Sequence, residues 1–309
     1  MSIDVSIIVP TFFRPEGLER AVRSLFSQLN PFRLAVELVI VDNDPAGGAR
    51  ATVERLQADA PYPTRYIHAA EPGVANARNA GIAGSSGALI AFLDDDEEAG
   101  ETWLCEMVGA QRFHDADAVF GPVLARVPDS VVAHHAYYAE FFSRSGPEES
   151  GLIEGYYGCG NSLIRRASLP GGDTPFDASR NMIGGEDDLL FAQMQRQHAR
   201  FVWCSEAPVW EDPSPSRASL GYTLRRAFAY GQGPSANCAA STPRNLPGLG
   251  FWMLVGAGQF TVYGLLAMLL WLVHSPMRAR MLDRAIRGLG KVFWWGPFKQ
   301  NFYGAAGMA

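Results

Sequence analysis

The segment Ala88-Leu-Ile-Ala-Phe-Leu-Asp-Asp-Asp-Glu-Glu98 joins six apolar residues directly to five consecutive acids. The apolar run has the length of a buried strand, and ligands of open α/β sheets bind at the carboxyl ends of such strands. Adjacent carboxylates repel one another unless a cation or hydrogen-bond donors stabilise them. Asp94, Asp95 and Asp96 therefore predict a site for Mg²⁺ or Mn²⁺, which would in turn neutralise a diphosphate. A solvated acidic turn is the alternative interpretation.

Around this segment, short β-branched runs alternate with helical patterns, which is typical of a sheet built largely from βαβ units. The expected strands are 5–9, 36–41, 64–67, 88–93 and 118–120. The expected helices are 15–26, 50–59, 73–83 and 101–114, with a Gly-Gly turn leading into a helix over 184–197. Loops with a short helix are expected over 128–151, and a proline-rich loop over 208–216. We therefore predict an α/β fold with a mixed, mostly parallel sheet flanked by helices.

A second acidic cluster, Gly184-Gly-Glu-Asp-Asp188, stands at the start of an expected helix. A carboxylate held there beside a cleft can act as a general base. Acids in a first helical turn also simply complement the helix dipole, and this structural interpretation stays open. The sequence has no P-loop, no Gly-x-Gly-x-x-Gly between strand and helix, and no Gly-x-Ser-x-Gly.

The composition argues against a nucleic-acid-binding protein and against a disordered chain. The chain has 309 residues, 48% of them hydrophobic, and a net charge of −6. An acidic chain of this kind is a poor nucleic-acid binder, and its apolar content is enough to form a core. Four cysteines without a Cys-x-x-Cys pair fit a reducing compartment and give no zinc spacing. The amino terminus lacks a secretory pattern, so we expect the body of the protein in the cytoplasm.

The C-terminal region differs from the rest. Residues 251–273 form an uncharged run of 23 with one strongly polar side chain, Gln259. From His274 onward six Lys/Arg oppose one acid, a net of +5, which leaves −11 for the remainder. A crossing helix would place this basic, amphipathic tail against the positive-inside tendency, so an in-plane or re-entrant membrane element fits better. A buried hydrophobic helix pair is the alternative.

Taken in order, these segments resemble the family 2 inverting glycosyltransferases of the GT-A fold, in the branch of bacterial exopolysaccharide synthesis. The resemblance covers about residues 5–232 and rests on seven segments: Val5-Ser-Ile-Ile-Val-Pro-Thr-Phe-Phe-Arg-Pro15, Val41-Asp-Asn-Asp44, Gly73-Val-Ala-Asn-Ala-Arg-Asn-Ala-Gly81, Phe92-Leu-Asp-Asp-Asp96, Gly158-Cys-Gly-Asn-Ser-Leu-Ile-Arg-Arg166, Gly184-Gly-Glu-Asp-Asp188 and Arg225-Arg-Ala-Phe-Ala-Tyr-Gly-Gln232. It implies a nucleotide-sugar donor, usually a UDP-sugar, and a divalent cation.

The resemblance also implies roles for individual residues. The residues implied to bind the donor are Pro10, Thr11, Phe12, Arg14, Asp42, Asn43, Arg78, Asn79, Asp94 and Asp95. Asp96 and Asp94 are the implied metal ligands, and Asp187 is the implied catalytic base, with Glu186 as its substitute. Asn161 and Trp210 would bind the acceptor, and Arg225 and Arg226 would also bind the diphosphate. From the residues alone, a solvated pair is the default interpretation of those last two arginines.

The chain departs from the family pattern in two places. A Thr-Tyr-Asn-Arg run reads Thr11-Phe-Phe-Arg14, which removes a hydroxyl and an amide near the nucleotide. Glu211-Asp212 stands where many relatives have a histidine, so assistance from a histidine at the diphosphate is not expected.

The implied function is metal-dependent, inverting transfer of a hexose, glucose by the resemblance, from a UDP-sugar to a hydroxyl of a lipid-linked oligosaccharide. We expect a transferase domain over 1–235 and membrane-associating helices over 236–309, at the cytoplasmic face of the inner membrane, where an undecaprenyl-diphosphate acceptor presents its sugars. Three alternatives remain: transfer onto polyprenyl phosphate, a non-catalytic nucleotide-sugar or glycan-binding module, and a phosphohydrolase. The last normally has its nucleophilic Asp after the first strand, where this chain has Pro10-Thr11.

Overall fold

The computed structural model describes residues 2–181 and 184–299. They form two compact units, one of residues 2–124 with 143–212 and one of residues 125–142 with 213–299. Residues 213–235 thus group with the second unit, whereas the sequence analysis assigns them to the first domain. The division into 1–235 and 236–309 remains a prediction about independent folding.

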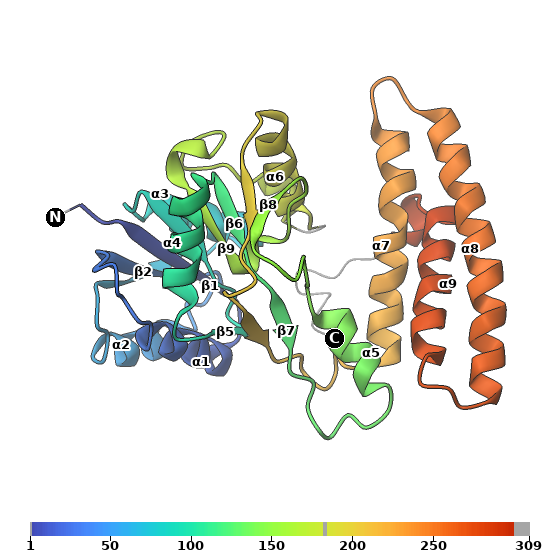
Figure 1. Cartoon of the computed structure of the whole chain (residues 1–309), viewed down its shortest axis with the longest axis horizontal. Helices are drawn as coiled ribbons and strands as arrows, with labels where there is room; N and C mark the ends of the chain where they lie inside the picture. The colour runs from blue at the N-terminus through green and yellow to red at the C-terminus, as the bar shows by residue number, and fades with distance from the viewer. Residues whose placement is uncertain (1, 182–183, 300–309) are drawn as a thin grey trace. The chain divides into compact units, whose positions relative to one another are not determined.

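An eight-stranded sheet forms the centre of the first unit (Figure 1). Its order is β3 (Thr64–His68), β2 (Val36–Asp42), β1 (Val5–Thr11), β4 (Leu89–Phe92), β9 (Ser162–Arg165), β6 (Ala118–Phe120), β10 (Phe201–Trp203) and β8 (Gly151–Ile153). The first four strands are parallel to one another, β9 runs antiparallel to both its neighbours, and β8 is antiparallel to β10. The predicted mixed, mostly parallel α/β sheet is confirmed.

Helices cover both faces of this sheet, so its central strands are buried on both sides. They are α1 (Pro15–Phe26), α2 (Arg50–Gln57), α3 (Val74–Ala83), α4 (Trp103–His114) and α6 (Glu186–Arg196), with 3₁₀ turns at Cys159–Asn161, Arg166–Ser168 and Ala178–Arg180. Along β1, Ile7 packs with the cluster that includes α1, and its neighbour Ile8 packs with α3 on the opposite face. This alternation fixes the register of the central strand.

A second, three-stranded sheet lies next to the acidic segment. Its order is β5 (Glu97–Ala99), β11 (Val209–Glu211) and β7 (Val123–Ala125). Trp210 pairs with Glu98 in antiparallel register, so the segment predicted as a proline-rich loop contains a strand. That prediction is wrong because Pro208 and Pro213 on either side indicate a loop, whereas the strand forms by pairing with β5.

The second unit is helical. It contains α5 (His135–Phe142), α7 (Leu220–Ala240), α8 (Leu246–Leu272), α9 (Arg278–Val292) and a 3₁₀ turn at Gly296–Phe298. Helices α7, α8 and α9, orange to red in Figure 1, lie side by side. Helix α8 is long and apolar enough to cross a membrane, and only 11% of its most apolar window is buried, which does not favour the alternative of a buried helix pair.

Candidate active site

The parallel half of the sheet reverses its order between β1 and β4, where ligands bind in open α/β folds. Asp95 lies at this point, directly after β4. Its carboxylate accepts from Thr11 Oγ1 at 2.8 Å and from the Phe12 N–H at 3.3 Å, and Arg14 Nη1 lies 3.1 Å from it. Burial raises the pKa of Asp95 to about 6, against the lowering effect of Arg14. Asp95 therefore ties the end of β1 to the acidic turn.

The two flanking carboxylates are more accessible. The Asp94 side chain is 32% exposed and the Asp96 side chain 19%, against 8% for Asp95. Asp96 Oδ2 lies 2.5 Å from Arg14 Nη1, and Asp94 Oδ1 lies 3.4 Å from Arg78 Nη2. Asp94 and Asp96 thus present oxygens to solvent while two guanidinium groups offset their charge.

The second acidic cluster begins α6. Gly184 and Gly185 have φ angles of +76° and +79°, which glycine adopts without strain, and they turn the chain into the helix. Glu186 is buried, with Oε1 2.5 Å from Arg78 Nη1, and burial raises its pKa against the opposing charge of Arg78. Asp187 is half-buried and accepts backbone N–H groups, from Cys159 at 3.3 Å and Asp188 at 2.9 Å.

Arg78 therefore contacts both acidic clusters, through Asp94 and Glu186. It projects from α3, is 5% exposed, and lies 5.6 Å from the centre of the Phe176 ring. The ion pair with Arg78 occupies Glu186, which leaves Asp187 as the accessible carboxylate of the pair. The predicted convergence of the two clusters is borne out by this geometry.

Two further charged residues surround Asp94, and the sequence analysis missed both. Glu97 Oε2 accepts the Asp94 N–H at 3.1 Å, and Glu97 Oε1 lies 3.1 Å from Arg144 Nη2. Glu97 is 2% exposed, and burial raises its pKa well above the usual range. Arg144 lies in a segment without periodicity or motif, so no sequence signal marks it.

Close packing explains two glycines of the Gly158-Cys-Gly segment. A Cβ on Gly158 would lie 2.1 Å from Arg144 Nη1, and a Cβ on Gly160 would lie 2.4 Å from Asp94 Oδ2. Any side chain at either position would displace a charged group of the site.

Several predicted donor residues make hydrogen bonds that shape the surrounding loops. Asp42 accepts from the Ala49 N–H and the Tyr66 hydroxyl, both at 2.9 Å. Asn43 donates to Ala69 O and Glu71 O and accepts from the Gly73 N–H. Asn79 bonds both backbone groups of Phe176, and Pro10 lies within the β1–β2 ladder. Their contacts with a nucleotide remain predictions.

The residues predicted to bind the acceptor, and the two arginines predicted to bind the diphosphate, lie on elements other than those that carry the two acidic clusters. Asn161 is 1% exposed, and its amide bonds Trp103 Nε1, Pro122 O and Ala207 O, so it braces the turn that carries Gly160. Trp210 is half-buried on β11. Arg225 and Arg226 belong to α7 in the second unit, where they bond Gly221 O and the Tyr230 hydroxyl of the same helix. Their roles remain predictions.

The carboxylates of the acidic turn, Asp94 and Asp96, suit a cation that is also bound by the phosphates of the donor. Among residues 2–181 and 184–299 no three His, Cys, Asp or Glu side chains form a group that could hold a metal by themselves. Mg²⁺ sites commonly use one or two carboxylates together with substrate phosphates, and the exposed oxygens of Asp94 and Asp96 match that incomplete set.

The chain belongs to glycosyl transferase family 2, whose model matches residues 6–170. It is 35% identical over 240 residues to the succinoglycan biosynthesis protein ExoM of Rhizobium meliloti, covering 75% of this chain and 74% of that protein. A shorter match, 32% identical over 95 residues and 30% of each chain, is to the GalNAc(5)-diNAcBac-PP-undecaprenol beta-1,3-glucosyltransferase of Campylobacter jejuni.

Solved structures support the same architecture. The mannosyltransferase PcManGT from Pyrobaculum calidifontis, in complex with GDP-Man and Mn²⁺, aligns with a TM-score of 0.62 at 18% identity, over 95% of this chain and 88% of that one. S. aureus TarS 1-349 in complex with UDP aligns at 0.52 and 17% identity, over 94% and 90%. The predicted GT-A fold, the enzyme class and the resemblance to the exopolysaccharide branch are confirmed.

Proposed function

We propose that this transferase moves a hexose from UDP to a hydroxyl of a lipid-linked oligosaccharide, with inversion at the anomeric carbon. The donor class draws support from the TarS–UDP neighbour, and the acceptor class from the undecaprenol-linked substrate in the name of the Campylobacter relative. The similarity to ExoM favours exopolysaccharide or cell-surface glycan synthesis. Glucose as the sugar draws support from the glucosyltransferase activity in the name of the Campylobacter relative. The reaction would take place at the cytoplasmic face of the inner membrane.

Asp187 is the proposed base. It takes the proton from the acceptor hydroxyl as that oxygen attacks the face of the sugar opposite UDP, a single displacement that needs one base and no enzyme nucleophile. Within the described part of the chain its two oxygens accept only backbone N–H groups, whereas Glu186 is paired with Arg78. This contrast between neighbouring carboxylates carries the proposal.

Arg14 and Arg78 would stabilise the leaving group, while Asp187 activates the acceptor. The departing UDP gains negative charge in the transition state, and positive groups fixed beforehand at the acidic turn stabilise it without reorganising. Asp96 and Asp94 would hold a divalent cation, Mg²⁺ or Mn²⁺, which when bound supplies Lewis-acid stabilisation of the diphosphate.

The decisive variant is Asp187→Asn, with Asp188→Asn as its matched control because Asp188 is exposed in the same helical turn. We expect Asp187→Asn to lower kcat at least about 10²-fold while UDP binding stays near wild type, since a general base contributes about 10²–10⁴-fold. Asp188→Asn should remain active.

The alternatives give different results. Full activity of Asp187→Asn with a polyprenyl phosphate acceptor would favour transfer onto that phosphate, which needs little base catalysis. Donor binding without turnover in the wild-type protein would indicate a binding module. Release of phosphate or of a sugar phosphate, with no glycoside formed, would indicate a phosphohydrolase.

A further inference from the structure

Helix α8 exposes apolar side chains along its length. Leu254, Leu265 and Leu272 are 76%, 54% and 73% exposed. Because they are spaced by 11 and 7 residues, they lie on one face of the helix. An exposed apolar surface of this size marks a lipid or protein contact.

Helix α9 packs closely against α8. A Cβ on Gly256 would lie 2.6 Å from Gly288 O, and a Cβ on Gly288 would lie 2.7 Å from Gly256 O. The two backbones are therefore in direct contact, as small residues allow. Any position that α8 takes in a bilayer is also imposed on α9.

Cations of α9 run alongside the apolar length of α8, in antiparallel order. The contacts are Arg278 5.3 Å from the Trp271 ring centre, Arg284 5.4 Å from the Tyr263 ring centre, and Lys291 Nζ 2.9 Å from Gln259 Oε1. If α8 crossed a bilayer, all three cations would be drawn into or across its hydrocarbon core, where charge is strongly unfavourable. The composition of α8 permits a crossing, but the cations of α9 oppose it.

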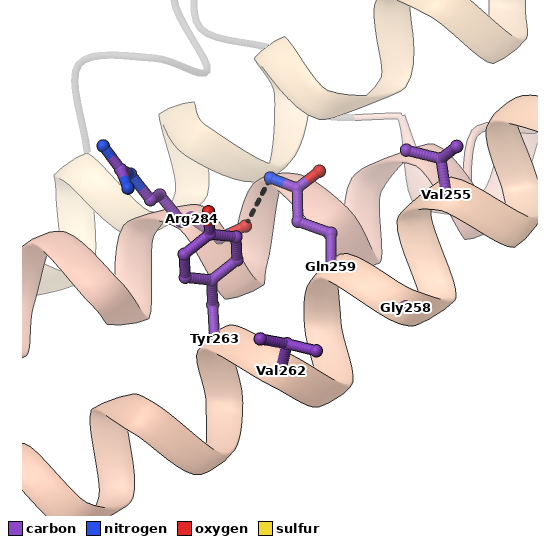
Figure 2. Close-up of a pocket in the computed structure, with 6 residues that line it drawn as sticks. All are labelled: Val255, Gly258, Gln259, Val262, Tyr263 and Arg284. Carbon is purple, nitrogen blue, oxygen red and sulfur yellow. Dashed lines mark hydrogen bonds between the residues drawn. The ribbon is translucent and has the colours of Figure 1, made fainter.

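A pocket of about 570 Å³ opens on this pair of helices. It is lined by Val255, Gly258, Gln259, Val262, Tyr263 and Arg284. Figure 2 shows the Tyr263 ring beneath the Arg284 side chain, and the Gln259 amide joined to the α9 backbone by its 2.9 Å hydrogen bond to Arg284 O. The pocket thus combines a guanidinium, an aromatic ring and valine side chains.

Arg284 differs from its neighbours on α9. Arg280 pairs with Glu140, and Arg287 pairs with Asp283 at 2.7 Å. No carboxylate among residues 2–181 and 184–299 pairs with Arg284, whose side chain is exposed. A guanidinium of this kind is suited to a phosphate, which it binds through two parallel N–H groups.

We propose that α8 and α9 lie along the surface of an anionic bilayer, and that this pocket binds the phosphate of an anionic phospholipid through Arg284. The exposed leucines of α8 then contact acyl chains, the valines of the pocket contact the first methylenes, and Tyr263 lies at the interface, where aromatic rings are favoured. The inference deepens the membrane association in the proposed function and is independent of the transfer reaction.

The phosphate site is tested with the full chain and vesicles of phosphatidylcholine, with or without phosphatidylglycerol. We expect Arg284→Gln to lower partitioning onto the phosphatidylglycerol vesicles about fivefold, and to leave binding to pure phosphatidylcholine unchanged. Arg284→Lys should retain most of the preference. Arg196→Gln removes an exposed charge from the first unit and should have no effect. Equal binding of the wild type to both vesicles, or an unaffected Arg284→Gln protein, would overturn the site.

The orientation is tested at Met277, which lies between α8 and α9 and is 45% exposed. Met277→Cys protein is added to preformed vesicles and treated with a membrane-impermeant maleimide, and mass spectrometry of peptides separates position 277 from the native cysteines. Labelling without detergent is expected, while protection that only detergent relieves would show that α8 crosses. Stabilisation by UDP, measured on the same variants, should be unchanged, so loss of lipid binding and loss of donor binding are distinguishable.

Discussion

Arg78 Nη1 lies 2.5 Å from Glu186 Oε1, and these two residues are 108 positions apart in the chain. The same guanidinium reaches Asp94, so one buried cation connects the acidic turn after β4 with the first turn of α6. The two acidic clusters of the candidate site are held together by this contact.

Replacing Arg78 by methionine should therefore destabilise the fold as well as abolish donor binding. The substitution leaves Glu186 buried without its partner, which typically costs about 3–5 kcal/mol. Urea unfolding measures the loss, and the double variant Arg78→Met/Glu186→Leu should recover part of it.

Arg23→Met provides the comparison. Arg23 is 55% exposed and pairs with Glu19 at 2.8 Å, so its removal should cost no more than about 1 kcal/mol. Equal losses for Arg23→Met and Arg78→Met would contradict the special position of Arg78.

Gly160→Ala should damage the acidic turn with little effect on the rest of the fold. Its Cβ would lie 2.4 Å from Asp94 Oδ2 and 3.0 Å from Glu97 Oε1, so Asp94 must move. We expect a loss of about 1–3 kcal/mol in unfolding free energy and a clear loss of UDP affinity by calorimetry. Gly155→Ala, with nothing within 4 Å of its Cβ, is the control and should match the wild type.

Much of the fold is predictable because its long elements are periodic. The apolar positions of α1 and the β-branched runs of β1 and β2 identify these elements from local sequence alone. Strands such as β9 and β10, of four and three residues, give no such signal and form through pairing with distant strands. The antiparallel direction of β9 likewise depends on tertiary context.

Candidate site residues can be predicted from the sequence only where they fall in recognisable motifs. Asp94, Asp96 and Asp187 are predicted in this way, whereas Arg144 beside Glu97 and Asn181 at the start of α3 belong to no motif. Asn181 Oδ1 accepts the Ala75 N–H at 3.0 Å and the Asn76 N–H at 3.3 Å, so it caps α3 from a loop more than a hundred residues away. Contacts of this kind depend on the folded arrangement and leave no local pattern.

Stability in acid should depend on Glu37. Burial alone would raise the pKa of this carboxyl, but hydrogen bonds from Ser6 at 2.7 Å and from Ser86 outweigh burial and lower it. A pKa that is lower in the folded state stabilises the protein above the unfolded value of 4.5 and loses that contribution as pH falls through the folded value.

Glu37→Gln should therefore reduce the unfolding free energy at neutral pH and flatten its decline in acid. Urea unfolding of both proteins, from neutral pH down to below the unfolded value, makes the comparison. Parallel curves for the two proteins would show that Glu37 contributes nothing to the acid transition.

We predict a cation requirement from the partly exposed pair Asp94 and Asp96, which offer too few ligands to hold a metal without donor phosphates. Thermal stabilisation by UDP should disappear in EDTA and return with Mn²⁺ or Mg²⁺, because metal and diphosphate complete each other's binding. Asp96→Asn should weaken the apparent metal affinity by at least about 10–100-fold, because loss of an outer-shell partner already has that effect and Asp96 would be a direct ligand. Glu98→Gln, in the same turn but 3.2 Å from Arg20, serves as the control and should behave as wild type. Undiminished stabilisation by UDP in EDTA would mean that Arg14 and Arg78 alone neutralise the diphosphate.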